Sequence, residues 1–359
     1  MMPSVFLYGL PVFLKSDFRR NRIDRLNEHL YILKKNRYIT NIEQGGLLME
    51  VGTPLRLNHN GFTRLTTPEL LLESAPLMWE WSRGACGHKQ SGGGMEEWGQ
   101  QQAAEKFSRP LDCSWYHGAW QYLRLLNMVA VPPWYEFYHS ALRKVLVERP
   151  HARVLIAACA DYGMLSTLHD AIDSCDASPN IEIYDICKTP LQSCEWYARR
   201  HGFTVHCVCD NLLTSASLPR HSFDLVVTDE FLTVIKGSDK PIITRRWEEL
   251  LSPDGTLVTT AMIGRETTPQ LRQGYAERAK RLIEESPRLS AVLGLSVREL
   301  SERTDRFADL HTRHMMSGEG ELKNLFSDFK LSFAPTGTPG ECVNPTDSFQ
   351  IVACREAGS

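Results

Sequence analysis

The stretch Arg-Val-Leu-Ile-Ala-Ala-Cys-Ala-Asp-Tyr-Gly-Met-Leu at residues 153–165 decides the fold of this 359-residue chain. It begins with a short apolar run containing β-branched residues, which is typical of a buried parallel strand. Small residues follow and lead into Asp161, Tyr162 and Gly163, after which apolar residues at spacings of three and four predict a helix. A strand, a tight turn and a helix predict the first unit of a nucleotide-binding sheet, whose turn lets a ligand approach the backbone closely.

Strands and helices alternate beyond this unit, as in a doubly wound sheet. The further predicted strands are residues 181–184, 203–208, 223–228, 256–262, 329–333 and 348–354. A helix that opens at Pro190 is closed by Gly202, and another is expected to break at residues 253–255. The last two strands are joined by a Pro/Gly-rich loop of hairpin type, so we expect the last strand to enter antiparallel.

A long helical region is predicted over residues 269–316, with a capping box from Ser296 to Glu299. Within it, His311 and His314 are expected one turn apart on a helix, where they are further candidate site residues.

The segment at residues 61–150 is predicted to form a helical cap rich in aromatic residues. Its helices are expected from Thr67-Pro68 onward, around Trp98 and Phe107, and at residues 114–128 and 134–147, with a Gly-rich hinge at 91–94. Such a cap suggests a lid, although its aromatic side chains could equally pack helix on helix. Residues 1–60 are a poorly defined basic extension, and whether residues 1–48 belong to the native protein is left open by Met49.

Composition limits the function classes. The net charge of −3 lacks the basic surplus of a nucleic-acid binder, and no apolar run approaches the roughly 20 residues that span a membrane. The ten cysteines show no metal-ligand spacing, so no metal site is predicted. We therefore expect a cytoplasmic protein without nucleic-acid or membrane partners, and a homodimer is left open.

Acidic residues follow three of the predicted strands, and these give the chain its resemblance to a known family. The set is Asp185 after the second strand, Asp210-Asn211 after the third, and Asp229 after the fourth. Together with the small-residue turn, the runs SFDLVVTD and LLSPDGTL and the terminal hairpin, it resembles the class I S-adenosylmethionine (SAM)-dependent methyltransferases from about residue 133 onward.

The resemblance implies an α/β fold: a Rossmann-like doubly wound seven-stranded sheet with an antiparallel last strand, a SAM-binding domain at residues 151–359 and an N-terminal helical cap. The SAM-binding residues that it implies are Ala158, Ala160, Asp161, Gly163, Asp185, Ile186, Asp210, Asn211, Thr228 and Asp229. Asp185 would meet the ribose, and Asp210-Asn211 the adenine. The turn has only one glycine, Gly163, and alanine does not adopt positive φ cheaply, so we expect its geometry to differ from the family's.

The predicted helix at residues 114–128 is the next candidate for the site. Tyr116, Trp120 and Arg124 are spaced to share one face, where aromatic rings would attract the SAM sulfonium and Arg124 would pair with the SAM carboxylate. His117 is a candidate base, and Tyr116 is the other candidate catalytic residue. The alternative for this helix is core packing, with His117 a satisfied core histidine.

The leading hypothesis is SAM-dependent methyl transfer to a small-molecule acceptor, which needs positioning and desolvation above all. The aromatic helix and small-residue turn also look similar to a bacterial branch of the fold that includes azetidine-2-carboxylate synthase-like enzymes, which cyclise SAM and release methylthioadenosine. That lyase activity is the second hypothesis, and a non-catalytic SAM-binding interaction module is the third.

Overall fold

The computed structural model describes residues 65–83, 112–129, 134–264, 267–336 and 347–355. The predicted basic extension, the hinge at residues 91–94 and the helix around Trp98 and Phe107 lie outside the described residues. Residue contacts divide the chain into Met1–Arg56 and Leu57–Ser359, and every described residue belongs to the second unit. No helix in the described part is both long enough and apolar enough to cross a membrane.

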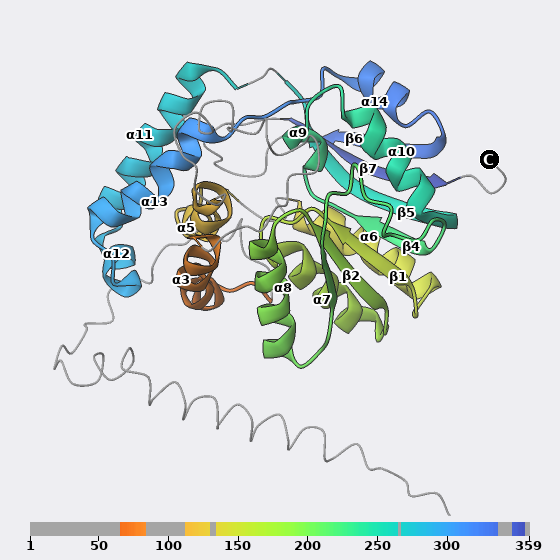
Figure 1. Cartoon of the computed structure of the whole chain (residues 1–359), viewed down its shortest axis with the longest axis horizontal. Helices are drawn as coiled ribbons and strands as arrows, with labels where there is room; N and C mark the ends of the chain where they lie inside the picture. Colours follow the sequence, from red (N-terminus) through yellow and green to blue (C-terminus); the bar gives the residue numbers. More distant parts are fainter. Residues whose placement is uncertain (1–64, 84–111, 130–133, 265–266, 337–346, 356–359) are drawn as a thin grey trace, which may run out of the picture. The chain divides into compact units, whose positions relative to one another are not determined.

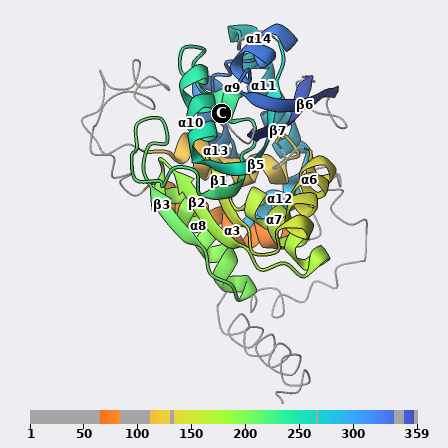
Figure 2. The same ribbon diagram turned by 90° about the vertical axis from the view of Figure 1, so that its right-hand side faces the viewer.

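A seven-stranded sheet forms the centre of this second unit (Figures 1 and 2). Its strands are β1 (Arg153–Ala157), β2 (Asn180–Asp185), β3 (His206–Cys209), β4 (Phe223–Val227), β5 (Leu251–Met262), β6 (Phe329–Thr336) and β7 (Ser348–Arg355). They are ordered β3-β2-β1-β4-β5-β7-β6. Strands β1 to β5 pair in parallel, whereas β7 is antiparallel to both β5 and β6. The predicted Rossmann-like sheet with an antiparallel last strand is confirmed.

Helices cover both faces of the sheet because its buried strands alternate their side chains between two hydrophobic clusters. In β4, Leu225 and Val227 join one cluster and Val226 joins the other. The first cluster includes side chains of α6 (Tyr135–Glu148), α7 (Gly163–Cys175) and α8 (Lys188–His201). The second includes side chains of α10 (Lys240–Leu250) and α14 (Glu319–Leu325), and α9 (Phe231–Val234) follows β4 directly.

Helices from two parts of the chain share the first of these clusters with the sheet. Those of the predicted cap are α3 (Pro68–Arg83), the π-helix η2 (Ser114–Gly118) and α5 (Ala119–Leu125), and those of the later helical region are α11 (Pro269–Glu285), α12 (Pro287–Leu293) and α13 (Val297–Leu310). Helix α13 packs on η2 and α5, and α12 packs on α3, so helices that are far apart in the sequence lie side by side (Figure 1).

Three predicted helix ends are confirmed. The Thr67 hydroxyl accepts from the Leu70 N–H at 3.3 Å, and Gly202 closes α8 in the left-handed conformation with φ of 78°. The capping box at Ser296 is present, with the Ser296 side chain on the Glu299 N–H and the Glu299 side chain on the Ser296 N–H.

The break predicted at residues 253–255 lies inside β5, which begins at Leu251 rather than at residue 256. The pairing of β4 with β5 shifts register here, and Asp254 adopts φ of 60°. A Cβ on Gly255 would lie 2.9 Å from the carbonyl oxygen of Phe223, so glycine is required for the two strands to approach. The turn residues therefore form a bulge within the strand instead of ending a helix.

The helical region predicted over residues 269–316 is present as three helices, with breaks at Ser286 and at Gly294, whose φ is 64°. Its last part is wrong, because α13 ends at Leu310. His311 has extended backbone, with φ of −68° and ψ of 123°, so His311 and His314 do not lie one turn apart on a helix. The predicted strand at residues 203–208 likewise begins only at His206.

Candidate functional site

The turn after β1 has left-handed backbone at Ala158, where φ is 57°. An alanine thus takes the positive φ for which glycine is the usual residue. Left-handed alanine costs about 1–2 kcal/mol. Two hydrogen bonds hold it in place: the Ala158 N–H donates to the Tyr184 carbonyl at 2.8 Å, and the Cys159 N–H donates to Asp185 Oδ2 at 2.9 Å.

Asp185 fastens this turn to the end of β2. Its Oδ2 accepts from Cys159, and its Oδ1 accepts from the Cys187 N–H at 2.7 Å. The side chain is buried, with 6% of the residue exposed. A carboxylate has about four lone-pair sites, so the two backbone donors leave acceptor capacity for a ligand hydroxyl. Ile186, between Asp185 and Cys187, is half-buried.

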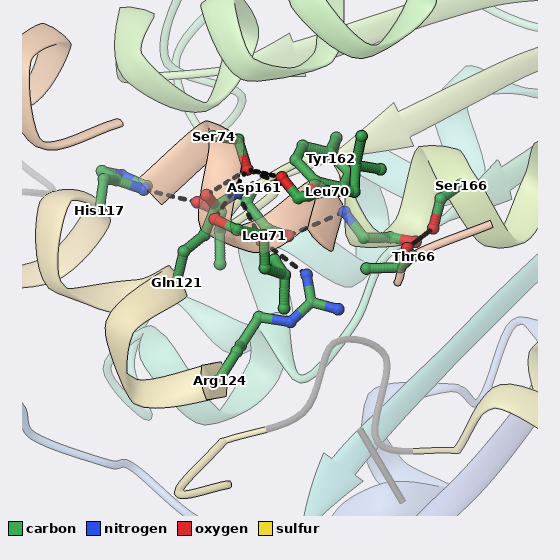
Figure 3. A network of polar contacts seen from close by, with 12 residues as sticks. Thr66, Leu70, Leu71, Ser74, His117, Gln121, Arg124, Asp161, Tyr162 and Ser166 are labelled. Atoms are coloured by element: carbon green, nitrogen blue, oxygen red, sulfur yellow. Dashed lines mark hydrogen bonds and ion pairs between the residues drawn. The ribbon is translucent and has the colours of Figure 1, made fainter. Parts of the chain in front are cut away.

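Asp161 and Arg124 form a buried ion pair that joins the turn to α5 (Figure 3). Arg124 Nη1 lies 2.7 Å from Asp161 Oδ2, and the two side chains are 1% and 0% exposed. Gln121 Nε2 also donates to Oδ2 at 3.2 Å, and the Gly163 N–H donates to Oδ1 at 2.8 Å. Arg124 and Asp161 were each predicted to bind SAM, and the structure pairs them with one another. One guanidinium nitrogen of Arg124 is therefore already bound to Asp161.

The Asp161 network continues into α3 through residues that the sequence did not point to. Ser74 Oγ donates to Gln121 Oε1 at 2.6 Å and lies 3.1 Å from the Tyr162 hydroxyl (Figure 3). Ser74 and Gln121 are both fully buried. A serine on the largely apolar buried face of α3 is the signal that could have identified Ser74, because buried polar side chains need partners.

His117 is held against the turn by a hydrogen bond between its Nδ1 and the Ala160 carbonyl oxygen, at 3.1 Å. A carbonyl oxygen only accepts, so Nδ1 carries the proton and Nε2 is the basic nitrogen of the neutral ring. The residue is 5% exposed. The structure therefore places His117 beside the predicted SAM turn, with its basic nitrogen on the opposite side of the ring.

Tyr116 lies in an aromatic group formed by η2, α5 and the end of α13. Its ring is 5.2 Å from that of Trp120 and stacks on Phe307 and His311 at 5.7 and 6.0 Å between centroids. Burial raises the pKa of Tyr116 well above its ordinary value, and the negative charges of Asp185 and Asp229 raise it further. Tyr116 is thus a neutral hydroxyl within the field of carboxylates from two strand ends.

His311 is brought to the site by the loop after α13 instead of by a helix face. Burial lowers the pKa of His311 well below its ordinary value, and the positive charges of Arg313 and Arg272 lower it further. The ring is therefore neutral at pH 7 and acts as a stacking surface for Tyr116 and Phe307.

The end of β4 carries two adjacent carboxyl groups, Asp229 and Glu230. Asp229 Oδ1 lies 2.9 Å from both the Tyr138 hydroxyl and Thr260 Oγ1. Burial, followed by the neighbouring Glu230, raises the pKa of Asp229 from 3.8 to about 8. Glu230 is buried at 9% exposure and has left-handed backbone, with φ of 53°. Only Asp229 of this group was predicted from the sequence, because Tyr138 and Thr260 come from distant elements.

Asp210 and Asn211, at the end of β3, use their side chains as hydrogen-bond acceptors for residues a few positions further along the chain. Asp210 Oδ2 accepts from Ser215 Oγ at 2.6 Å, and this hydrogen bond lowers the pKa of Asp210. Asn211 Oδ1 accepts from the Leu213 N–H at 3.0 Å. Both side chains stay half-buried at the predicted strand end.

Two buried polar atoms near these groups fit a bound SAM. Among the described residues, neither Thr228 Oγ1 nor Trp120 Nε1 has a hydrogen-bond partner. Thr228 is 1% exposed and directly precedes Asp229, and a buried hydroxyl without a partner costs about 1–3 kcal/mol. The carboxylates and aromatic rings around Tyr116 also suit a sulfonium cation.

No protein-family model and no curated protein sequence matches the chain. Among solved structures, it is similar to a SAM-dependent methyltransferase from Methanosarcina mazei, with 18% identity and a TM-score of 0.40 over 58% of this chain and 94% of that one. It is also similar to the N-methyltransferase NodS from Bradyrhizobium japonicum in complex with S-adenosyl-L-homocysteine, with 11% identity and a TM-score of 0.39 over 65% of this chain and 98% of that one. A third is the CMeT domain of the citrinin polyketide synthase, with 13% identity and a TM-score of 0.42 over 65% of this chain and 54% of that one.

Proposed function

We propose that this protein transfers the methyl group of SAM to a small-molecule acceptor. The observation that supports this most is the meeting of three features at the carboxyl ends of β1, β2 and β4. They are the left-handed turn tied to Asp185, the aromatic group around Tyr116, and the carboxyl pair beside Thr228. In open α/β sheets, ligands bind at the carboxyl ends of the strands.

SAM supplies the electrophilic methyl group. The chain's residues would orient the two reactants, exclude water from them and take up the proton that the acceptor loses. The aromatic rings of Tyr116, Trp120 and Phe307 would exclude water around the sulfonium and stabilise its charge. His117 would accept the acceptor's proton at Nε2, because its Nδ1 proton is held by Ala160. Asp185 would accept from the ribose hydroxyls with its remaining lone pairs.

Cyclisation of SAM itself is the second candidate function, and the stacking of Tyr116 on Phe307 and His311 favours it as well. An aromatic enclosure around the sulfonium serves intramolecular attack by the SAM amine equally, and His117 would then deprotonate that amine. This reaction needs no acceptor and releases methylthioadenosine.

One experiment separates these candidates. The purified protein is incubated with SAM alone and with SAM plus a metabolite extract, and products are identified by mass spectrometry. S-Adenosylhomocysteine that forms only with the extract supports methyl transfer. Methylthioadenosine with a small cyclic amino acid, formed from SAM alone, would replace methyl transfer by cyclisation. Binding of SAM without any product would leave an interaction module.

Asp185→Ala is expected to weaken SAM binding by about 1–3 kcal/mol, because the ribose hydroxyls and two backbone N–H groups lose their acceptor. Titration calorimetry with SAM measures the affinity, and thermal unfolding reports how much the turn itself is loosened. Asp173→Ala, on the outer part of α7, is the matched control and should bind SAM as wild type does. An unchanged affinity in Asp185→Ala would remove Asp185 from the site.

A further inference from the structure

Two buried cysteines meet where the cap contacts the end of β2. Cys113 Sγ lies 3.4 Å from Cys187 Sγ and 3.2 Å from Thr189 Oγ1. Cys113 is 6% exposed and Cys187 is 0% exposed, and these two residues form a hydrophobic cluster of their own. Neither cysteine is required by the proposed methyl transfer.

Both cysteines are attached to the candidate site through their backbones. The Cys113 carbonyl accepts from the N–H groups of Tyr116 and His117, at 3.1 and 3.0 Å, and so closes the first turn of η2. The Cys187 N–H donates to Asp185 Oδ1. A covalent bond between the two sulfurs would therefore fasten the aromatic helix to the strand end that carries Asp185.

We propose that Cys113 and Cys187 form a site of oxidative modification, at which an intramolecular disulfide locks the cap onto the sheet. A disulfide needs a sulfur separation of about 2.05 Å, so the thiols must approach by a little over 1 Å from their present contact. The sequence separation of 74 residues makes the closed loop long, and long loops gain the most stability from closure.

The oxidant is a small disulfide such as oxidised glutathione. The Cys113 thiolate, on the more exposed residue, attacks one glutathione sulfur and releases the first glutathione thiolate. The Cys187 thiolate then attacks the Cys113 sulfur of the mixed disulfide and releases the second. The protein loses two electrons, and one glutathione disulfide gains them and becomes two glutathione molecules. The two protons of the cysteine thiols are taken up by the two glutathione thiolates.

Peptide mapping of the full-length protein tests the link directly. After equilibration with reduced and oxidised glutathione at several ratios, free thiols are blocked and the protein is cut after Lys, Arg and Glu. These cuts place Cys113 alone in residues 107–124 and Cys187 alone in residues 183–188. We expect these two peptides to be recovered as a disulfide-linked pair in oxidising buffer and as separate peptides after reduction.

Thermal unfolding provides the second readout. The oxidised protein is expected to melt about 5–10 °C above the reduced protein, and a reductant should abolish the difference. The shift should be lost in Cys113→Ser and kept in Cys175→Ser, whose thiol lies on α7 and bonds the Ala171 carbonyl. Recovery of residues 107–124 and 183–188 only as separate peptides at every glutathione ratio, or linkage of Cys113 to another cysteine, would overturn the proposal. Neither readout requires SAM turnover, so the result is independent of the proposed function.

Discussion

Arg124→Met is expected to destabilise the fold by about 3–5 kcal/mol. The substitution leaves the Asp161 carboxylate buried at 0% exposure without its charged partner, and an uncompensated buried charge carries a cost of this size. The loss should be seen as a lower free energy of unfolding in denaturant titration. SAM binding should weaken as well, because Asp161 also fixes the turn through the Gly163 N–H.

Arg149→Met is the matched control for Arg124→Met. Arg149 makes a similar contact with Asp224 at 2.9 Å, but the two side chains are 34% and 28% exposed. Solvent screens this pair, so we expect a loss of about 1 kcal/mol or less. Equal effects of the two substitutions would show that the Arg124–Asp161 pair does not hold the cap to the turn. Adding Asp161→Asn to Arg124→Met should restore part of the lost stability, because the uncompensated charge is removed.

Asp229→Asn is expected to change how stability depends on pH. The pKa of Asp229 is raised from 3.8 to about 8 in the folded protein, so folding favours its protonated form. The stability that this group contributes is complete below about pH 4 and is lost as the pH rises towards 8. The neutral amide does not ionise and should keep the hydrogen bonds from Tyr138 and Thr260.

The effect of Asp229→Asn is measured by denaturant unfolding at pH 5, 7 and 9. Relative to wild type, the variant should gain about 1–3 kcal/mol of unfolding free energy between pH 5 and pH 9, and partial contact of Asp229 with solvent keeps the gain in this range. Asp210→Asn is the control, and its stability should change with pH in the opposite direction. The hydrogen bond from Ser215 lowers the pKa of Asp210, so the stability that Asp210 contributes is lost as the pH falls through its pKa in the folded protein. Parallel pH profiles of wild type and Asp229→Asn would contradict the burial of this carboxyl.

The positions of the seven strands along the chain and several helix ends follow from local chemistry and were therefore predictable. Apolar runs between turn residues mark the strands, and Thr67, Gly202 and Ser296 mark helix ends through hydrogen bonds within a few residues. The prediction failed where tertiary pairing overrides local preference. Residues 253–255 carry turn chemistry, but pairing with β4 keeps them within β5 as a bulge.

The candidate site was predictable only in part. The sequence placed Asp185, Asp229 and the turn at strand ends, because parallel strands bring their carboxyl ends to one edge. It could not show that Arg124 meets Asp161, or that Tyr138 and Thr260 meet Asp229, since these pairs join residues 31 to 91 positions apart. That Asp185 and Asp229 contact SAM stays a prediction.

Periodicity and turn residues act over short distances, so they were enough to locate the strands and to show that the last strand enters antiparallel. The tertiary structure alone decided the state of the polar groups. Ala158 has left-handed backbone, Arg124 forms a buried ion pair with Asp161, and the pKa of Asp229 is raised. The physical reason is that burial makes the energy of a charge or a strained backbone depend on partners that only the folded chain brings together.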